Sequence, residues 1–153
     1  METLRVPAVL DSIDDVVRYV RELARCAGLC SRRTGHLRLA AEELVANVVM
    51  HGYGPRGAPA RAVELEGGID GDRVWLRIVD DAPPFDPTRV PDPDDLRRPL
   101  TERTPGGLGL YLARCAVDGM AYESVGGRNV VTLTVHRAQP ASVSVGYRRG
   151  ESA

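Results

Sequence analysis

Residues 37–53 read LRLAAEELVANVVMHGY, and this stretch decides how the chain folds. At about 100° per residue its apolar side chains fall on one arc, which predicts a helix from Thr34 to His51 that packs on a core. Glu43, Asn47 and His51 recur every four positions, along the border of that arc. A carboxylate, an amide and an imidazole on one border are placed to face a polar cavity, although a solvated helix edge is the alternative for so short a pattern.

Hydrophobic periodicity on either side of this helix predicts both helices and strands. The expected strands cover residues 3–9, 62–69, 73–79, 121–125 and 129–135, and two further helices run to Ala27 and from 108 to 117. Turn signals at Gly71–Asp72 and Gly126–Arg128 imply hairpins and therefore antiparallel pairing. We expect an α+β two-layer sandwich in which helices cover one face of a mixed, mostly antiparallel sheet.

Length and charge limit what the chain is expected to do. With 153 residues, 43% of them apolar, we expect a single domain over residues 1–137 and a loose C-terminal tail over 138–153. The net charge of −1 gives no general field toward nucleic acid or an anionic membrane, so we expect neither as a direct partner. All 20 basic residues are Arg, which excludes a Walker A loop and every chemistry that needs a Lys. A bound phosphate would be held by backbone amides, a metal or Arg.

The cysteines and the N-terminus favour a reducing compartment. Three Cys residues are an odd and sparse set, unlike a disulfide scaffold. Buried thiols are expected rather than a metal site, because no second Cys or His pair lies near Cys26 and Cys30 in the sequence. No signal peptide or membrane span is recognised, so we expect a cytoplasmic protein.

A second candidate site lies where the expected strand 74–79 ends. Asp80 follows that apolar strand directly, and a carboxylate there is costly unless something pairs with it. Adenine offers an exocyclic amino donor where guanine has a carbonyl oxygen, so a fixed carboxylate would favour adenine. The alternative is an Asp that only caps a turn. Phe85, the single Phe, is expected to pack rather than to touch a ligand.

A third candidate is the glycine-rich run at residues 104–112, TPGGLGLYL, which leads into a helix. Backbone without Cβ atoms can approach an anion, and the helix N-terminus presents free N–H groups to it, although simple chain reversal is the alternative. Seven of the 11 prolines lie between Pro83 and Pro105, so neither a long helix nor a central strand can pass through. We expect a lid at about 86–105, with disorder as the alternative.

Together the three patterns resemble the GHKL ATPase superfamily and, within it, the bacterial anti-sigma-factor serine/threonine kinases. The resemblance spans about Leu37 to Leu133 and rests on these segments: LAAEELVAN at 39–47 with HGY at 51–53, Asp80 with FDP at 85–87, GGLGL at 106–110, and GRNVVTL at 127–133. It implies the Bergerat ATP-binding fold. Phosphate binding in this superfamily does not depend on a Walker Lys.

The resemblance also implies roles for residues around ATP. Asn47 would hold Mg²⁺, and Glu43 would orient or deprotonate the attacking hydroxyl. Asp80 would accept from the adenine amino group, with Thr132 supporting that contact through water. Gly107, Leu108 and Gly109 would wrap the phosphates beneath the lid.

Two positions depart from the usual pattern of this family. Ala82 replaces the Gly expected two residues after the adenine Asp, which leaves less room beside the base. Pro105 stands where subfamily members often carry Arg, so Arg103, slightly upstream, is the candidate phosphate clamp.

The function implied by the resemblance is that of an Mg-ATP-dependent protein kinase in a bacterial partner-switching system. It would phosphorylate a small, STAS-type anti-sigma-factor antagonist and sequester a sigma factor or similar target. A homodimer is a possible assembly for such a protein. Two alternatives remain: a nucleotide-dependent binding module without kinase activity, and a stand-alone histidine-kinase-like ATPase domain.

Overall fold

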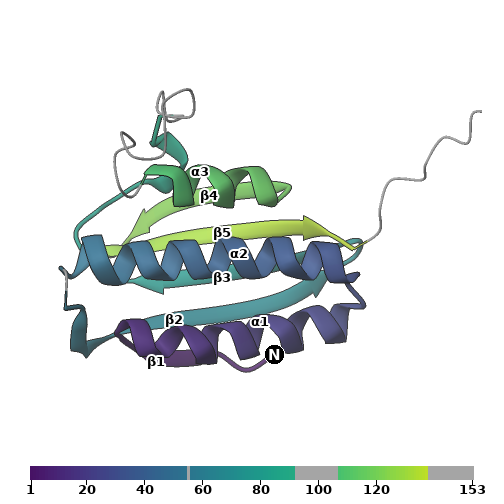
Figure 1. Cartoon of the computed structure of the whole chain (residues 1–153), viewed down its shortest axis with the longest axis horizontal. Coiled ribbons are helices and arrows are strands. Elements are labelled where there is room, and N and C mark those ends of the chain that lie inside the picture. The colour runs from purple at the N-terminus through teal and green to yellow at the C-terminus, as the bar shows by residue number, and fades with distance from the viewer. Residues whose placement is uncertain (55, 92–106, 138–153) are drawn as a thin grey trace, which may run out of the picture.

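Five strands form one antiparallel sheet, and three helices lie on one face of it (Figure 1). The structure is a computed structural model that describes residues 1–54, 56–91 and 107–137. In spatial order the strands are β1 (Leu4–Ala8), β2 (Ala58–Asp70), β3 (Arg73–Asp80), β5 (Arg128–His136) and β4 (Gly119–Val125). The expected α+β two-layer sandwich is confirmed.

All pairings among the described strands are antiparallel, so the parallel component of the expected mixed sheet is not found in this part of the chain. The connections explain why. β2 and β3 form one hairpin and β4 and β5 another, while two successive helices between β1 and β2 carry the chain across the sheet and back.

The three helices are α1 (Ile13–Ala27), α2 (Ser31–Asn47) and α3 (Gly107–Ala116). α1 ends at Gly28, whose φ of 67° lies in the left-handed region that glycine adopts without strain. α2 begins three residues before the expected Thr34. Its N-cap Cys30 makes no side-chain bond and its first turn holds no acidic residue, so the sequence carries no marker of this start. After Asn47 the helix widens into a π-helical turn, Val48–Gly52.

The core lies between the sheet and the helices. Fully buried side chains come from both layers: Val16, Val20 and Leu23 of α1, Leu37 and Val45 of α2, and Leu65, Leu76, Ile78 and Leu133 of the sheet.

The three cysteines do not belong to this core. Cys26, Cys30 and Cys115 are exposed free thiols, which corrects the expectation of buried ones. Cys26 and Cys115 lie on the exposed sides of α1 and α3, and Cys30 lies in the turn before α2, so none of the three faces the core.

Two expected segments fall partly or wholly outside the described residues. Of the expected lid, only its first residues are described, and Pro87–Arg89 form a short 3₁₀ turn. Residues 92–106, with Arg103 and Gly106, and the expected tail 138–153 lie outside the description. Among the helices that are described, none has the length and apolar character needed to span a membrane.

Candidate functional site

Asp80 closes β3 at the inner face of the sheet, where it is 3% exposed. Its Oδ1 accepts two hydrogen bonds, from the Ala82 backbone N–H and from Asn129 Nδ2, both at 2.9 Å. Burial raises the pKa of the Asp80 carboxyl, and these two bonds oppose that rise only in part. Within the described residues Oδ2 receives no hydrogen bond, so one oxygen is fixed by the protein and the other is left for a ligand.

Asn129 on β5 is the functional residue that the sequence analysis missed. It lies opposite Asp80 in the β3–β5 register and is 4% exposed. Besides bonding Asp80, its Nδ2 donates to the carbonyls of Ala82 at 3.0 Å and Pro83 at 3.3 Å. Its Oδ1 accepts from Tyr122 Oη at 2.7 Å and the Phe85 N–H at 3.2 Å. One buried amide therefore holds both Asp80 and the loop that follows it.

A signal for Asn129 was present in the sequence. Val131, Leu133 and Val135 alternate as the inward-facing positions of β5, and Asn129 occupies the next inward position of the same set. A polar residue in an inward series needs a buried partner.

Thr132 is not brought together with Asp80. It pairs with Arg77, and its side chain points to the face of the sheet opposite the helices, because successive side chains of a strand alternate between faces. The role expected for Thr132 beside Asp80 is corrected on this ground: the β5 residue beside Asp80 is Asn129.

Ala82 fits the turn after Asp80 without strain. No residue other than glycine has a positive φ among the described residues, and Ala82 is buried. Its Cβ occupies space that is free because the neighbouring residue is Gly52. A Cβ on Gly52 would lie only 2.9 Å from the Cβ of Ala82. The methyl group added at Ala82 is therefore matched by Gly52, the last residue of the π-helical turn.

The outer side of the same turn is held by Tyr53, just after α2. Its hydroxyl donates to the Asp81 carboxylate and accepts from the Asp81 N–H at 3.1 Å. Arg61 on β2 forms an ion pair with Asp81 at 2.7 Å. Burial, followed by the bond to Asp81, raises the pKa of Tyr53 to about 12, so the hydroxyl stays a donor across the physiological range.

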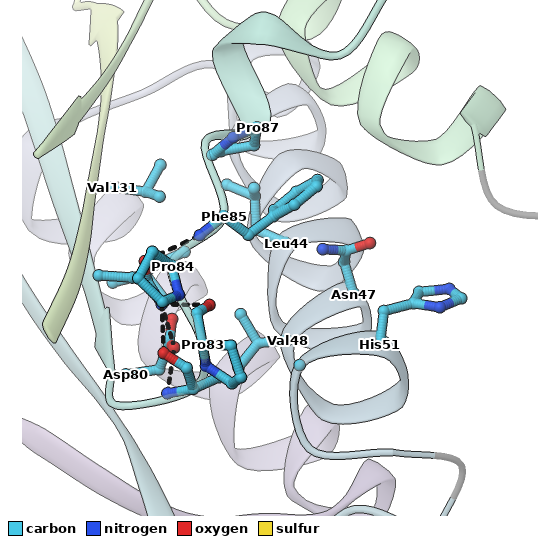
Figure 2. Close-up of a pocket in the computed structure, with 14 residues that line it drawn as sticks. Leu44, Asn47, Val48, His51, Asp80, Pro83, Pro84, Phe85, Pro87 and Val131 are labelled. Atoms are coloured by element: carbon cyan, nitrogen blue, oxygen red, sulfur yellow. Dashed lines mark hydrogen bonds between the residues drawn. The ribbon is translucent and has the colours of Figure 1, made fainter. Parts of the chain in front are cut away.

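A cavity of about 210 Å³ opens above Asp80, between the sheet and α2 (Figure 2). Its walls are apolar, from Ile78 and Val131 of the sheet, Leu44 of α2 and Val48 of the π-helical turn. Phe85 extends from the loop toward α2 at the rim and is 46% exposed, so it does not pack in the core as expected. An apolar slot with one free carboxylate oxygen suits a flat heteroaromatic ring that carries a hydrogen-bond donor.

A second cavity, of about 410 Å³, lies between α2 and α3. It is lined by Glu43 of α2, by Met50 of the π-helical turn and by Leu108, Gly109 and Leu112 of α3. Asn47 and His51 line both cavities, so the two meet where α2 passes into the π-helical turn. The π-helical turn begins directly after Asn47, and such turns are frequent at functional sites.

Glu43 and Gly109 approach each other across this second cavity. A Cβ on Gly109 would lie 2.1 Å from Glu43 Oε2, so the carboxylate occupies the space that any larger residue at 109 would fill. Gly107, Leu108 and Gly109 form the first turn of α3, whose backbone N–H groups have no partner within the helix. The structure thus brings Glu43, Asn47, Leu108 and Gly109 around one cavity; Arg103 lies outside the described residues.

These residues fit a bound ATP. The free Oδ2 of Asp80 matches an amino donor, and a second cavity continues past Asn47 to the first turn of a helix, a position that favours phosphate. Among the described residues no group of three or more His, Cys, Asp or Glu side chains is placed to hold a metal ion. An Mg²⁺ ion bound through Asn47 needs no such group, because Mg²⁺ is usually held by one or two side chains together with substrate phosphates.

Comparison with known proteins places the chain among nucleotide-binding domains. Residues 6–135 match the family described as histidine kinase-like ATPase domain. The serine/threonine-protein kinase BtrW of Bordetella bronchiseptica is 32% identical over 137 residues, which cover 90% of this chain and 94% of the relative.

Solved structures share the fold at lower identity. A crystal structure of the RsbU and RsbW domains of Rv1364c from Mycobacterium tuberculosis superposes with a TM-score of 0.59 at 20% identity, over 92% of this chain. The chain spans only about a third, 34%, of that larger protein chain. The catalytic domain of histidine kinase ThkA gives a TM-score of 0.50 at 13% identity, covering 90% of this chain and 98% of that one.

Proposed function

The chain belongs to the histidine kinase-like ATPase family, and on that premise we propose that it is an Mg-ATP-dependent serine/threonine protein kinase of a partner-switching system. The observation that carries the proposal is the continuity of the site. One free carboxylate oxygen lies at the end of an apolar slot, and the slot meets a second cavity where Glu43 and Asn47 stand one helical turn apart. A nucleotide can be held at one end while its terminal phosphate is reached at the other.

Each residue has a proposed task at this site. Asp80 Oδ2 accepts from the exocyclic amino group of adenine, and the apolar walls hold the ring. Asn47 binds the metal through its side-chain oxygen, and the free N–H groups at the start of α3, Gly107 to Gly109, face the phosphates. Arg103 remains the candidate clamp on the phosphate charge.

Glu43 is proposed to act on the acceptor hydroxyl. Bound Mg-ATP would supply the transferable γ-phosphoryl group and the metal charge that offsets its negative charge. The Glu43 carboxylate lines the cavity beside Asn47 and accepts or orients the proton of the incoming Ser or Thr hydroxyl. Closure of the segment 86–105 over this site is part of the proposal.

The proposed protein substrate is a small STAS-type antagonist, and the proposed sequestered target is a sigma factor or a similar protein. BtrW carries the name of a serine/threonine-protein kinase, which supports an acceptor hydroxyl on a protein. We place this activity in the cytoplasm.

The test separates binding from transfer with two variants on one helix. Glu43→Gln keeps the shape of the side chain, so Mg-ATP affinity should stay nearly unchanged while transfer to a co-purifying STAS-type partner falls by ~10²-fold or more. Asn47→Ala should weaken Mg-ATP binding itself, by roughly tenfold. Glu42→Gln is the matched control, since Glu42 is ion-paired with Arg38 and does not line either cavity.

The assay also distinguishes the alternatives. If Glu43→Gln transfers phosphate as fast as the unmodified protein, the assignment of Glu43 is wrong. If the unmodified protein exchanges partners in response to nucleotide but transfers no phosphate, the nucleotide-dependent binding module replaces the kinase.

A further inference from the structure

A third cavity, of about 410 Å³, lies at the opposite end of α2 from the proposed ATP site. Arg32, Arg33 and His36, from the first two turns of α2, line one side, and Cys115, Asp118 and Val135 are among the residues on the other. None of these residues lines the two cavities of the proposed ATP site. Arg33 and Asn47 are separated by about 21 Å along the helix axis, at about 1.5 Å per residue.

Arg33 is anchored by only part of its guanidinium group. Its side chain is 14% exposed, and Nη1 donates to Asp118 Oδ2 at 3.2 Å and to the His136 carbonyl at 3.1 Å. Its Nε is the one buried side-chain nitrogen or oxygen without a hydrogen-bond partner in the described part of the chain. Nε and Nη2 form the guanidinium edge that binds an oxyanion through two parallel hydrogen bonds, and no described residue is bonded to that edge.

The positive charge of this cavity is not balanced by the residues around it. Arg32 is exposed and makes no ion pair with any described residue. Asp118 is the single acidic residue of the lining, and the same oxygen that meets Arg33 also accepts the His136 N–H at 2.7 Å. The first turn of α2 holds no acidic residue, so the positive end of the helix dipole adds to the two arginines.

We infer that this cavity is a second anion site, which takes a phosphate monoester. Arg32, Arg33 and His36 line this cavity from one helix face and supply N–H donors, and the oxygens of a phosphate can accept from all three. A phosphate also has more oxygens that can accept from these donors than a carboxylate has. The ester is either a small soluble metabolite or a phosphorylated side chain of a protein segment, since both present the same group.

Inorganic phosphate is the first probe, added to the isotope-labelled full chain in phosphate-free buffer. Saturable shifts are expected at the backbone amides of residues 32–36 and 115–118. Arg32→Gln should weaken this binding by about tenfold, the loss expected for one charge-assisted hydrogen bond. Arg38→Gln is the matched control: it removes the same charge from the same helix at a residue outside the cavity, and it should leave the binding unchanged.

A second variant and two further probes sharpen the assignment. Arg33→Lys keeps the charge but removes the two-donor edge, so it should also weaken phosphate binding; if this variant does not fold, Arg32→Gln decides alone. Tighter binding of a phosphoserine peptide than of its unphosphorylated form assigns the site to a protein segment, and tighter binding of glycerol phosphate than of phosphate assigns it to a metabolite.

Three results would overturn the inference. The first is an absence of shifts at these amides up to tens of millimolar phosphate. The second is shifts confined to residues 43–52 and 107–110, which would place the anion in the ATP site. The third is an equal loss of binding in Arg32→Gln and Arg38→Gln, which would indicate bulk charge alone. The first and third results do not bear on whether Glu43 and Asn47 act on ATP, and the second would leave that proposal standing.

Discussion

The base end and the phosphate end of the proposed ATP site are built in different ways. At the base end, Asp80 and Asn129 come from paired strands and are almost fully buried, and Asn129 alone makes five hydrogen bonds. At the phosphate end, Glu43 and Asn47 are partly exposed side chains of one helix that face the first turn of another. The hydrogen bonds within the protein fix the base end, whereas the proposed phosphate end would be completed by the ligand.

This difference indicates which changes affect folding and which affect only chemistry. Removing a group from a buried network in which every group is hydrogen-bonded leaves several partners unpaired. Both the free energy of unfolding and the affinity for nucleotide should then fall. Removing a group that awaits a ligand leaves the fold intact.

The largest effect is expected for Asn129→Ala. Loss of the amide leaves the groups that bonded it unpaired in a buried place, so the free energy of unfolding should fall by about 3 kcal/mol. Affinity for ADP should also fall, because Asp80 and the turn after it lose their anchor. Urea denaturation and calorimetry measure the two losses. Thr132→Ala, on the same strand but on the opposite face, should change neither; a nucleotide affinity lowered as much by Thr132→Ala would contradict this account of the base end.

A smaller effect, confined to the ligand, is expected for Asp80→Asn. The Asn oxygen can keep both bonds that Asp80 Oδ1 accepts, while an amino group replaces the oxygen that faces the base. ATP affinity should fall by roughly tenfold and the preference for ATP over GTP should disappear. Titration calorimetry with both nucleotides measures this, with Asp81→Asn as the neighbouring control. Equal affinities for ATP and GTP in the unmodified protein would remove Asp80 from this role.

At the phosphate end, Gly109→Ala should slow transfer without weakening ADP binding. The new Cβ would overlap with Glu43 Oε2, so the carboxylate must move away from its place beside Asn47. Because side-chain placement governs the rate, transfer should fall by roughly fivefold. Gly35→Ala in α2 has open space around it and should leave transfer unchanged. A rate unchanged in Gly109→Ala would show that the observed position of Glu43 is not the one that matters.

The smallest effect is a pH dependence at the base end. Folding raises the pKa of Asp80, so its carboxyl should become protonated at a pH above the unperturbed Asp pKa of about 3.9. Nucleotide affinity should fall as the pH is lowered through the pKa of folded Asp80. Stability should respond with the opposite sign: the folded state binds this proton more tightly, so the contribution of Asp80 to stability is greatest below its unfolded pKa and declines as pH rises through its folded pKa. Asp80→Asn should remove both dependences. An affinity profile identical in the two proteins would refute the assignment.

Much of the fold could be predicted from the sequence, and so could the part of the site that Glu43, Asn47 and Asp80 form. The helix that carries Glu43 and Asn47 follows from apolar spacing, and Asp80 stands out because it directly follows an apolar strand. The role of Asn129 is not evident from the motif that contains it, because its partner Asp80 is 49 positions away and only the β3–β5 register places the two together. The same register places the Thr132 side chain on the face of the sheet opposite the site, since a shift by one residue reverses the side on which a strand residue lies.

The sequence by itself determined the alternation of helices and strands, the row of Glu43, Asn47 and His51 along one helical border, and the absence of Lys from any phosphate site. These are local properties, set by side-chain periodicity and composition, and they need no partner from elsewhere in the chain. Only the tertiary structure decided which oxygen of Asp80 is free, that Ala82 is matched by Gly52, and that Arg33 keeps an unpaired edge in a basic cavity. Those properties depend on contacts between distant segments, and such contacts are fixed by strand register and by packing between the layers.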